Sequence, residues 1–311
     1  MDLNSILKPL AENLLSPIPM CFALGVFCKL IHGGIKIPKE LYYTISIYLL
    51  MSIGFIGGHE LAKEVHHNGV AGVWKPALTT LFLGCLTPIT AYVILKYVGR
   101  LSPADAAGIA AHYGSTSAVT YAVANAFAES QKCAPNGFIP TLVTILECPG
   151  IAIALAIGAV ATKAAHKSDR ALDPEVAEQQ EGKFGEALYE VLTGQSIMLM
   201  AGMLIIGFVS TFFMKDAVVF PELKELKDYT AYYAELKASF YPFHEFFYSK
   251  GMIFRGALCI FLLEMGLVAG ERLGDLLKVG PFLVAFGILW PLAHGFLAAF
   301  LGYEAGLNLG G

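Results

Sequence analysis

Long apolar runs recur along this chain and constrain its fold more than any other feature. We place them near residues 17–35, 41–58, 74–97, 104–127, 138–162, 194–214, 251–270 and 281–302. About 18 apolar residues are enough for a helix to cross the roughly 30 Å of hydrocarbon in a bilayer. The runs lack the strict polar–apolar alternation that the strands of an outer-membrane barrel require. The sequence therefore predicts an all-α integral membrane protein.

Composition supports the same prediction and excludes several functions. Of the 311 residues, 56% are hydrophobic and only 15% are charged, and the mean hydropathy of +0.61 is far above that of an ordinary soluble domain. The net charge of −4 argues against a nucleic-acid partner. The six cysteines form no Cys-x-x-Cys pair, so the sequence predicts neither a zinc site nor a disulfide framework.

Two parts of the chain echo each other in sequence. "IGFIGGHEL" (53–61) aligns with "MGLVAGERL" (265–273), and "GCLTP" (84–88) shares the spacing of its Gly and Pro with "GILWP" (287–291). We therefore predict a first membrane repeat of five spans over 1–165, a polar linker over 166–190 and a second repeat over 191–311. An odd number of spans per repeat inverts the second repeat in the membrane, as in many secondary transporters.

The second repeat has only three spans in this sequence. At an offset of about 203 to 212 residues, the counterpart of "HYGSTSAVTYAVAN" (112–125) falls beyond Gly311. The repeat interpretation thus predicts two further spans, supplied either by a longer form of the chain or by a second polypeptide. The alternative is that the repeat interpretation is wrong.

The stretch "HYGSTSAVTYAVAN" concentrates hydroxyl groups in a segment that is otherwise typical of a membrane span. In one interpretation, these hydroxyls bond to carbonyl groups one turn earlier, and the small residues let helices approach each other. In the other, the helix breaks at Gly114, so that free amides, carbonyls and hydroxyls can bind ions at the bilayer midplane. The predicted substrate-binding residues are then Gly114, Ser115, Thr116 and Ser117.

Glu147 is the second feature that points to function. It lies within the apolar run 138–162, directly before Cys148 and Pro149, and a buried carboxylate costs a few kcal/mol unless it is paired. We predict that Glu147 binds sodium or clamps the broken helix, with Thr120 and Asn125 as supporting residues. A structural hydrogen bond is the alternative role for Glu147. His59, His66 and His67 are placed in a solvated loop, and no transition-metal site is predicted, because the His-Glu-x-x-His pattern is absent.

Several segments together resemble the sodium-dependent bicarbonate transporters of cyanobacteria and the related bacterial permeases. They are "GFIGGHEL", "AAHYGSTSAVTYAVA", "LECPGIAIAL", "FRGALCIFLLEMGLVAGERLGDLLK" and "PLAHGFLAAFLG". The resemblance implies inverted five-span repeats with broken, crossing helices, a homotrimer, a PII-like cytoplasmic regulator, and import of bicarbonate with sodium across the cytoplasmic membrane. It also implies that residues 114–117 match the substrate motif and that Glu147 matches an acidic residue before a proline.

We expect a sodium-coupled bicarbonate symporter that uses no cofactor other than sodium as the coupling ion. Moving one monovalent anion inward against 100 mV costs about 2.3 kcal/mol, and one accompanying sodium ion cancels that charge. The alternatives are a sodium-coupled transporter of another small carboxylate, or an uncoupled channel-like or structural membrane protein. An enzyme is not expected, because no activated nucleophile, metal cluster or phosphate-binding loop has convincing spacing.

Overall fold

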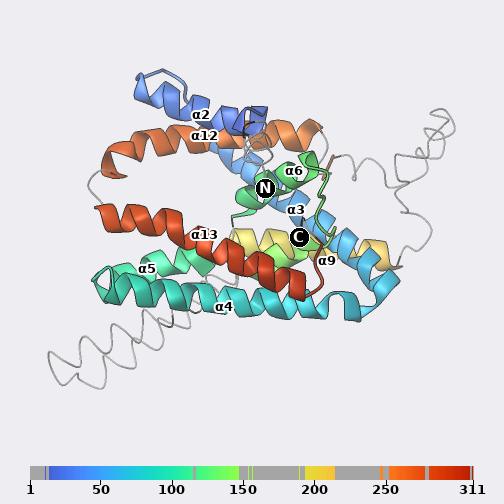
Figure 1. The fold of residues 1–311 in the computed structure, drawn as a ribbon. Coiled ribbons are helices and arrows are strands. Elements are labelled where there is room, and N and C mark those ends of the chain that lie inside the picture. The colour runs from blue at the N-terminus through green and yellow to red at the C-terminus, as the bar shows by residue number, and fades with distance from the viewer. Residues whose placement is uncertain are drawn as a thin grey trace.

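The computed structural model describes residues 14–114, 117–146, 193–213, 252–276 and 280–308, with the isolated residues 11, 153, 156, 189, 246, 247 and 310. All regular elements among these residues are helices (Figure 1). The predicted all-α fold is confirmed for this part of the chain. Glu147 and nearly all of the predicted linker 166–190 lie outside the described residues.

Among the described residues, five helices are long and apolar enough to cross a membrane. They are α3 (Lys39–Asn68), α4 (Trp74–Tyr97), α9 (Gln195–Phe213), α12 (Met252–Leu276) and α13 (Pro281–Glu304). A shorter apolar helix, α2 (Pro17–Leu30), precedes them, and a single 3-10 turn, η1 (Val70–Gly72), joins α3 to α4. The protein is therefore a multi-pass membrane protein.

Helix α3 differs most from its prediction. It continues to Asn68, ten residues past the predicted end of the span, so His59, His66 and His67 are helical and the predicted loop is wrong. His59 is buried, and its Nδ1 lies 2.7 Å from the Thr211 hydroxyl of α9. The pair Gly57–Gly58 suggested a helix end in the sequence. In the structure a β-carbon on Gly58 would overlap the Leu204 carbonyl oxygen, so this glycine serves close packing instead.

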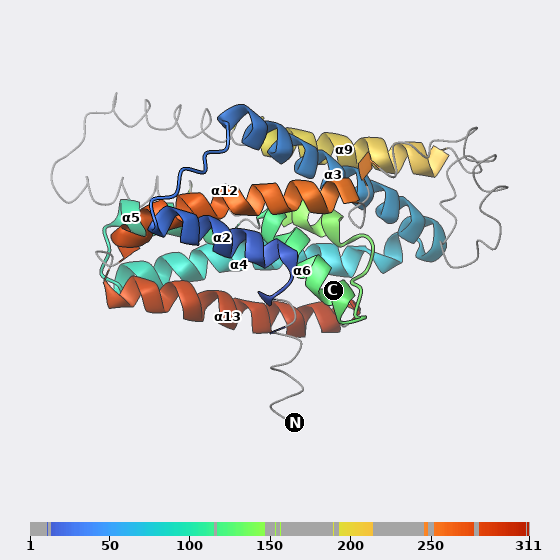
Figure 2. The same cartoon turned by 90° about the horizontal axis from the view of Figure 1, so that it is seen from above.

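Helices α2, α3, α9 and α12 form what we call the first helix group. α3 lies beside α9, α12 lies beside α2, and α12 also contacts α3 (Figure 2). Glycines let the backbones meet within both pairs, because β-carbons on Gly54, Gly207, Gly25 or Gly266 would come too close to main-chain atoms of the facing helix. The core of this group contains Ile45, Leu49, Met200, Leu258 and Phe261.

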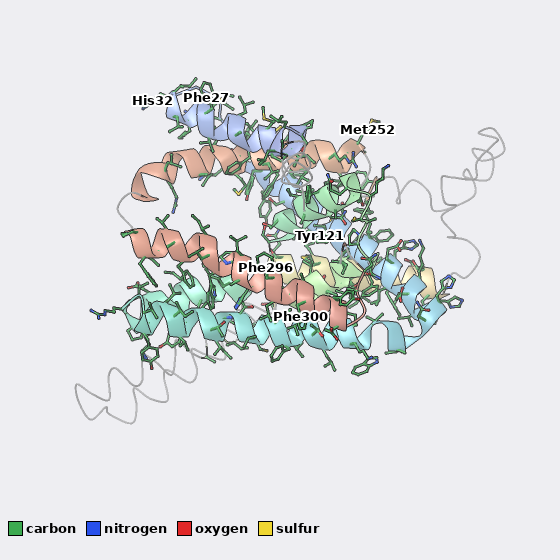
Figure 3. The ribbon with its side chains drawn as sticks, viewed as in Figure 1. Phe27, His32, Tyr121, Met252, Phe296 and Phe300 are labelled. Atoms are coloured by element: carbon green, nitrogen blue, oxygen red, sulfur yellow. The ribbon has the colours of Figure 1, made fainter. Side chains whose placement is uncertain are left out.

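Helices α4, α5 (Pro103–Gly114) and α13 form the second helix group. They share a separate core that contains Ala91, Leu95, Ala106, Ala110 and Phe286. The outer face of α13 carries large apolar side chains that no other described residue covers, among them Phe296 (78% exposed) and Phe300 (61% exposed) (Figure 3). So much apolar exposure suits a bilayer and not water.

Candidate functional site

The apolar run 104–127 is not one span but two short helices with a break between them. Helix α5 is described up to Gly114, and α6 (Ala118–Ser130) begins after Ser117, whose backbone is extended at φ −66° and ψ 124°. The Ser117 side chain accepts a hydrogen bond from the Thr120 amide at 3.4 Å, so it caps the new helix. A break in this run is thus observed at Ser117, three residues after the predicted position Gly114. Ser115 and Thr116 lie outside the described residues.

A cavity of about 420 Å³ borders this break. It extends from the end of α5, past His294 in α13, to Leu307 beyond the end of α13, and Leu142 and Leu146 of the helical residues 139–146 close one side. No described residue that lines it carries a charged side chain. Its polar side chains are those of Thr79, Thr80, Thr87, Tyr113 and His294.

Thr87 lies level with the helix break. Helices α4 and α5 are neighbours joined by the short connection 98–102, so they run in opposite directions. Both rise about 1.5 Å per residue, and counting in each direction from the middle of the connection brings Thr87 opposite Tyr113 and Gly114. All three residues line the cavity. Thr79 and Thr80 lie about two turns of α4 further from the break.

His294 is held within the cavity wall by its neighbours. Its ring centroid lies 4.6 Å from that of Trp290, and its Nε2 lies 3.4 Å from the Thr90 hydroxyl. The Thr90 hydroxyl donates to the Leu86 carbonyl at 2.7 Å, so it accepts a hydrogen bond from His294. The proton of a neutral imidazole is therefore placed on Nε2.

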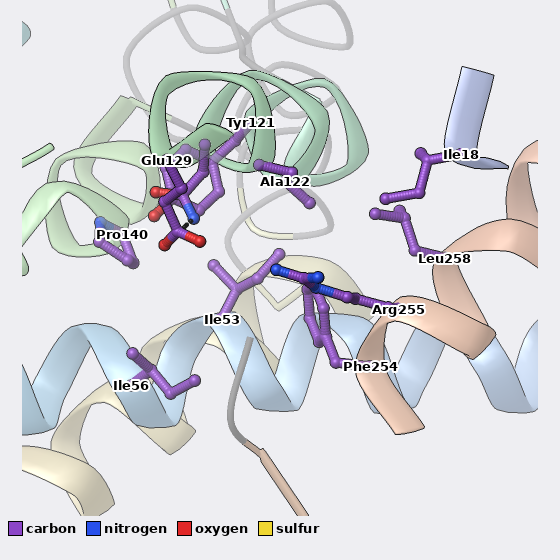
Figure 4. Close-up of a pocket in the computed structure, with 12 residues that line it drawn as sticks. Ile18, Ile53, Ile56, Tyr121, Ala122, Glu129, Pro140, Phe254, Arg255 and Leu258 are labelled. Atoms are coloured by element: carbon purple, nitrogen blue, oxygen red, sulfur yellow. Dashed lines mark hydrogen bonds between the residues drawn. The ribbon is translucent and has the colours of Figure 1, made fainter. Parts of the chain in front are cut away.

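Two other predicted site residues that the structure describes, Thr120 and Asn125, do not line this cavity. Thr120 is exposed, and the Asn125 side-chain amide donates to Glu129 Oε1 at 3.1 Å. Asn125 and Glu129 line a separate pocket of about 20 Å³ between α6, α3 and α12, which Arg255 enters from the opposite side (Figure 4). Such a pocket has room for one water molecule.

Of the predicted site residues that the structure describes, Gly114 is the one that lies in the cavity wall. Sequence analysis missed the threonines of α4. A signal for them was present: Thr80 and Thr87 are seven residues apart and therefore share one face of a helix. That spacing alone could not show that the shared face borders the break.

A protein-family model matches residues in both helix groups. The family model described as the Na+-dependent bicarbonate transporter superfamily matches residues 17–223 and 233–311. The chain belongs to this superfamily. Membership confirms the predicted resemblance and, at the level of the superfamily, indicates sodium-dependent transport of bicarbonate. A comparison with curated proteins gave no match.

Proposed function

We propose that this member of the superfamily is a symporter that imports bicarbonate together with sodium across the cytoplasmic membrane, and that both ions bind beside the break between α5 and α6. Membership of the superfamily supports bicarbonate and sodium as the transported ions. The observation that carries the proposal is the 420 Å³ cavity at the break, lined by hydroxyls and an imidazole and without a charged side chain among its described residues.

A cavity of this kind favours two ions of opposite charge over one. Taking a single anion out of water is costly unless a nearby charge compensates it. Two unit charges 4 Å apart attract each other by about 4 kcal/mol at the effective dielectric constant of 20 that suits such sites. A sodium ion therefore supplies the countercharge that the described lining lacks, and binding of each ion strengthens binding of the other.

The helix pairing supports the inverted-repeat architecture that this mechanism needs. In the proposed arrangement, α2 and α3 begin the first repeat, and α9 and α12 begin the second. The first helix of each repeat then packs on the second helix of the other: α2 on α12, and α9 on α3. Such an exchange relates the two halves of the first helix group by an approximate two-fold axis, as expected for inverted repeats. The homotrimer and the PII-like regulator are further proposals that rest on the family resemblance.

Labelled bicarbonate uptake into proteoliposomes tests the function directly. We expect an inward sodium gradient to drive accumulation above equilibrium, whereas an equal potassium gradient does not. Uptake that is indifferent to sodium would instead favour the uncoupled alternative. Equal competition by acetate and unlabelled bicarbonate would favour a transporter of small carboxylates in general.

A further inference from the structure

The residues that follow α13 fold back onto the end of their own helix. Gly306 has a positive φ of 95°, and the Leu307 amide donates to the Gly302 carbonyl at 2.9 Å, which is the bond of a Schellman motif. This motif brings Leu307 against Gly302, where a β-carbon would lie 3.3 Å from Leu307 Cδ1. Leu307 is thereby fixed at the end of the cavity that it helps to line.

Leu307 also packs on an apolar core that lies outside α13. The buried members of this core are Val73, directly before α4, and Phe138 and Leu142, which follow α6. Leu142 lines the cavity as well. Leu307 thus connects the α13 wall of the cavity to the side that Leu142 closes.

Asn308 bonds the same segment to the connection between α6 and the helical residues 139–146. Its backbone amide donates to Asn136 Oδ1 at 2.9 Å, and its side-chain amide donates to the Ala134 carbonyl at 3.0 Å. Asn308 Oδ1 accepts a hydrogen bond from the Gly310 amide at 3.2 Å, so both ends of the side-chain amide are bonded. Two of these three bonds join parts of the chain that are 172 and 174 residues apart.

We infer that Asn136 and Asn308, which we call the clasp, are positioning residues for transport because they hold the end of α13 and so set the width of the cavity. Gly287 and Gly295 of α13 have open space where a β-carbon would be, so packing at these positions does not hold the helix. Without the clasp, α13 would sample several positions, and the fraction of protein that is ready to bind would fall. The apparent affinity falls in proportion to that fraction. The inference rests on the proposed function, since it takes this cavity as the place where the ions bind.

The kinetics of bicarbonate uptake at fixed sodium, measured in the intact protein, test the inference. Asn136→Ala removes the oxygen that accepts from the Asn308 amide, so we expect the half-saturating bicarbonate concentration to rise about threefold to tenfold. The maximal rate should stay close to that of wild type. Asn136→Asp keeps the oxygen and should behave like wild type. Asn68→Ala is the matched control, because it removes an exposed bond from Asn68 to Glu64, 2.8 Å long, within α3.

A cross-link distinguishes a clasp from a gate that must open. The double variant Asn136→Cys, Asn308→Cys is made in a background with Cys133→Ser and treated with a short bifunctional thiol reagent that a reductant removes. Before treatment, it should have the raised half-saturating concentration of Asn136→Ala. Cross-linking should restore the wild-type value, and the reductant should reverse the restoration. Loss of uptake on cross-linking would overturn the inference, and the Cys133→Ser background given the same treatment is the control.

Hydrogen exchange provides a readout that does not depend on transport. The amides of residues 303–310 should exchange faster in Asn136→Ala than in wild type or in Asn136→Asp, because the Asn308 amide loses its acceptor. An unchanged half-saturating concentration or unchanged exchange in Asn136→Ala would overturn the inference. If the wild type took up no bicarbonate, the proposed function would fail instead, and hydrogen exchange would still show whether the clasp holds the end of α13.

Discussion

Glycines in the paired helices of the first group and glycines in α13 of the second have opposite surroundings. In the first group, a β-carbon added to Gly25, Gly54 or Gly58 would meet the backbone of a neighbouring helix. In the second group, Gly287 and Gly295 of α13 have open space where a β-carbon would be. The comparison teaches that the helix pairs α2–α12 and α3–α9 form a close-fitting frame, whereas α13 has open space at Gly287 and at Gly295. Gly295 also lines the cavity, so the proposed ion site borders α13 and not the frame contacts.

The frame contains two side-chain contacts at equivalent positions of the two aligned segments. His59 and Glu271 occupy equivalent positions in the aligned segments 53–61 and 265–273. Each contacts the helix that packs on its own: His59 Nδ1 lies 2.7 Å from Thr211 Oγ1, and Glu271 Oε2 lies 3.1 Å from Lys29 Nζ. The position is the same, but one contact is buried and the other is exposed. Removal of the buried contact should therefore lower the free energy of unfolding more than removal of the exposed one.

The largest effect is expected at the close contact between α3 and α9, within the frame. Gly58→Ala forces apart the backbones of α3 and α9, and we expect a loss of roughly 3 kcal/mol or more in the free energy of unfolding. Gly287→Ala places the same methyl group in open space and removes a helix-weakening glycine, so it should be neutral or stabilising by about 0.5 to 1 kcal/mol. Thermal unfolding in detergent measures both. Equal melting temperatures for the two variants would contradict the contrast between the groups.

A smaller effect is expected at the buried contact in the frame. Thr211→Val removes the hydroxyl that contacts His59, whose side chain is almost completely buried. Loss of one hydrogen bond at a buried polar group should cost about 1 to 3 kcal/mol. Denaturant or thermal unfolding of the purified protein provides the measurement, with Thr211→Ser as the variant that keeps the hydroxyl. Equal stability of the valine and serine variants would show that this contact contributes little.

The smallest effect is expected at the exposed ion pair between Lys29 and Glu271. The side chains of Lys29 and Glu271 are 39% and 65% exposed, and ion pairs of this kind typically contribute no more than about 1 kcal/mol. Glu271→Gln should therefore change the melting temperature less than Thr211→Val does. Raising the salt concentration should shrink the remaining difference from wild type. A larger loss in Glu271→Gln than in Thr211→Val would reverse the order proposed for the two contacts.

Local sequence features predicted much of the helix framework. The bounds of α4 and α9 lie within a residue of the predicted spans, because charged or turn-forming residues end these apolar runs. A break in the run 104–127 was predictable from the density of its hydroxyls, and it is described at Ser117. The end of α3 was not predictable, because a Gly–Gly pair in the sequence is compatible both with the end of a helix and with close packing against a neighbouring helix. The threonines that line the cavity escaped prediction because their place there depends on which face of α4 lies beside α5 and α13.

The short length of α5 has an electrical consequence. Its 12 residues rise only about 18 Å, a little over half the thickness of the hydrocarbon core. Under the proposed function, a sodium ion that travels from one face to the break between α5 and α6 therefore crosses only part of the transmembrane voltage. If that part is about half, binding gains or loses about 1.2 kcal/mol for every 100 mV. The membrane potential would then set how tightly the ion is held as well as how fast it is carried, so an energised cell and a depolarised one would present sites of different affinity.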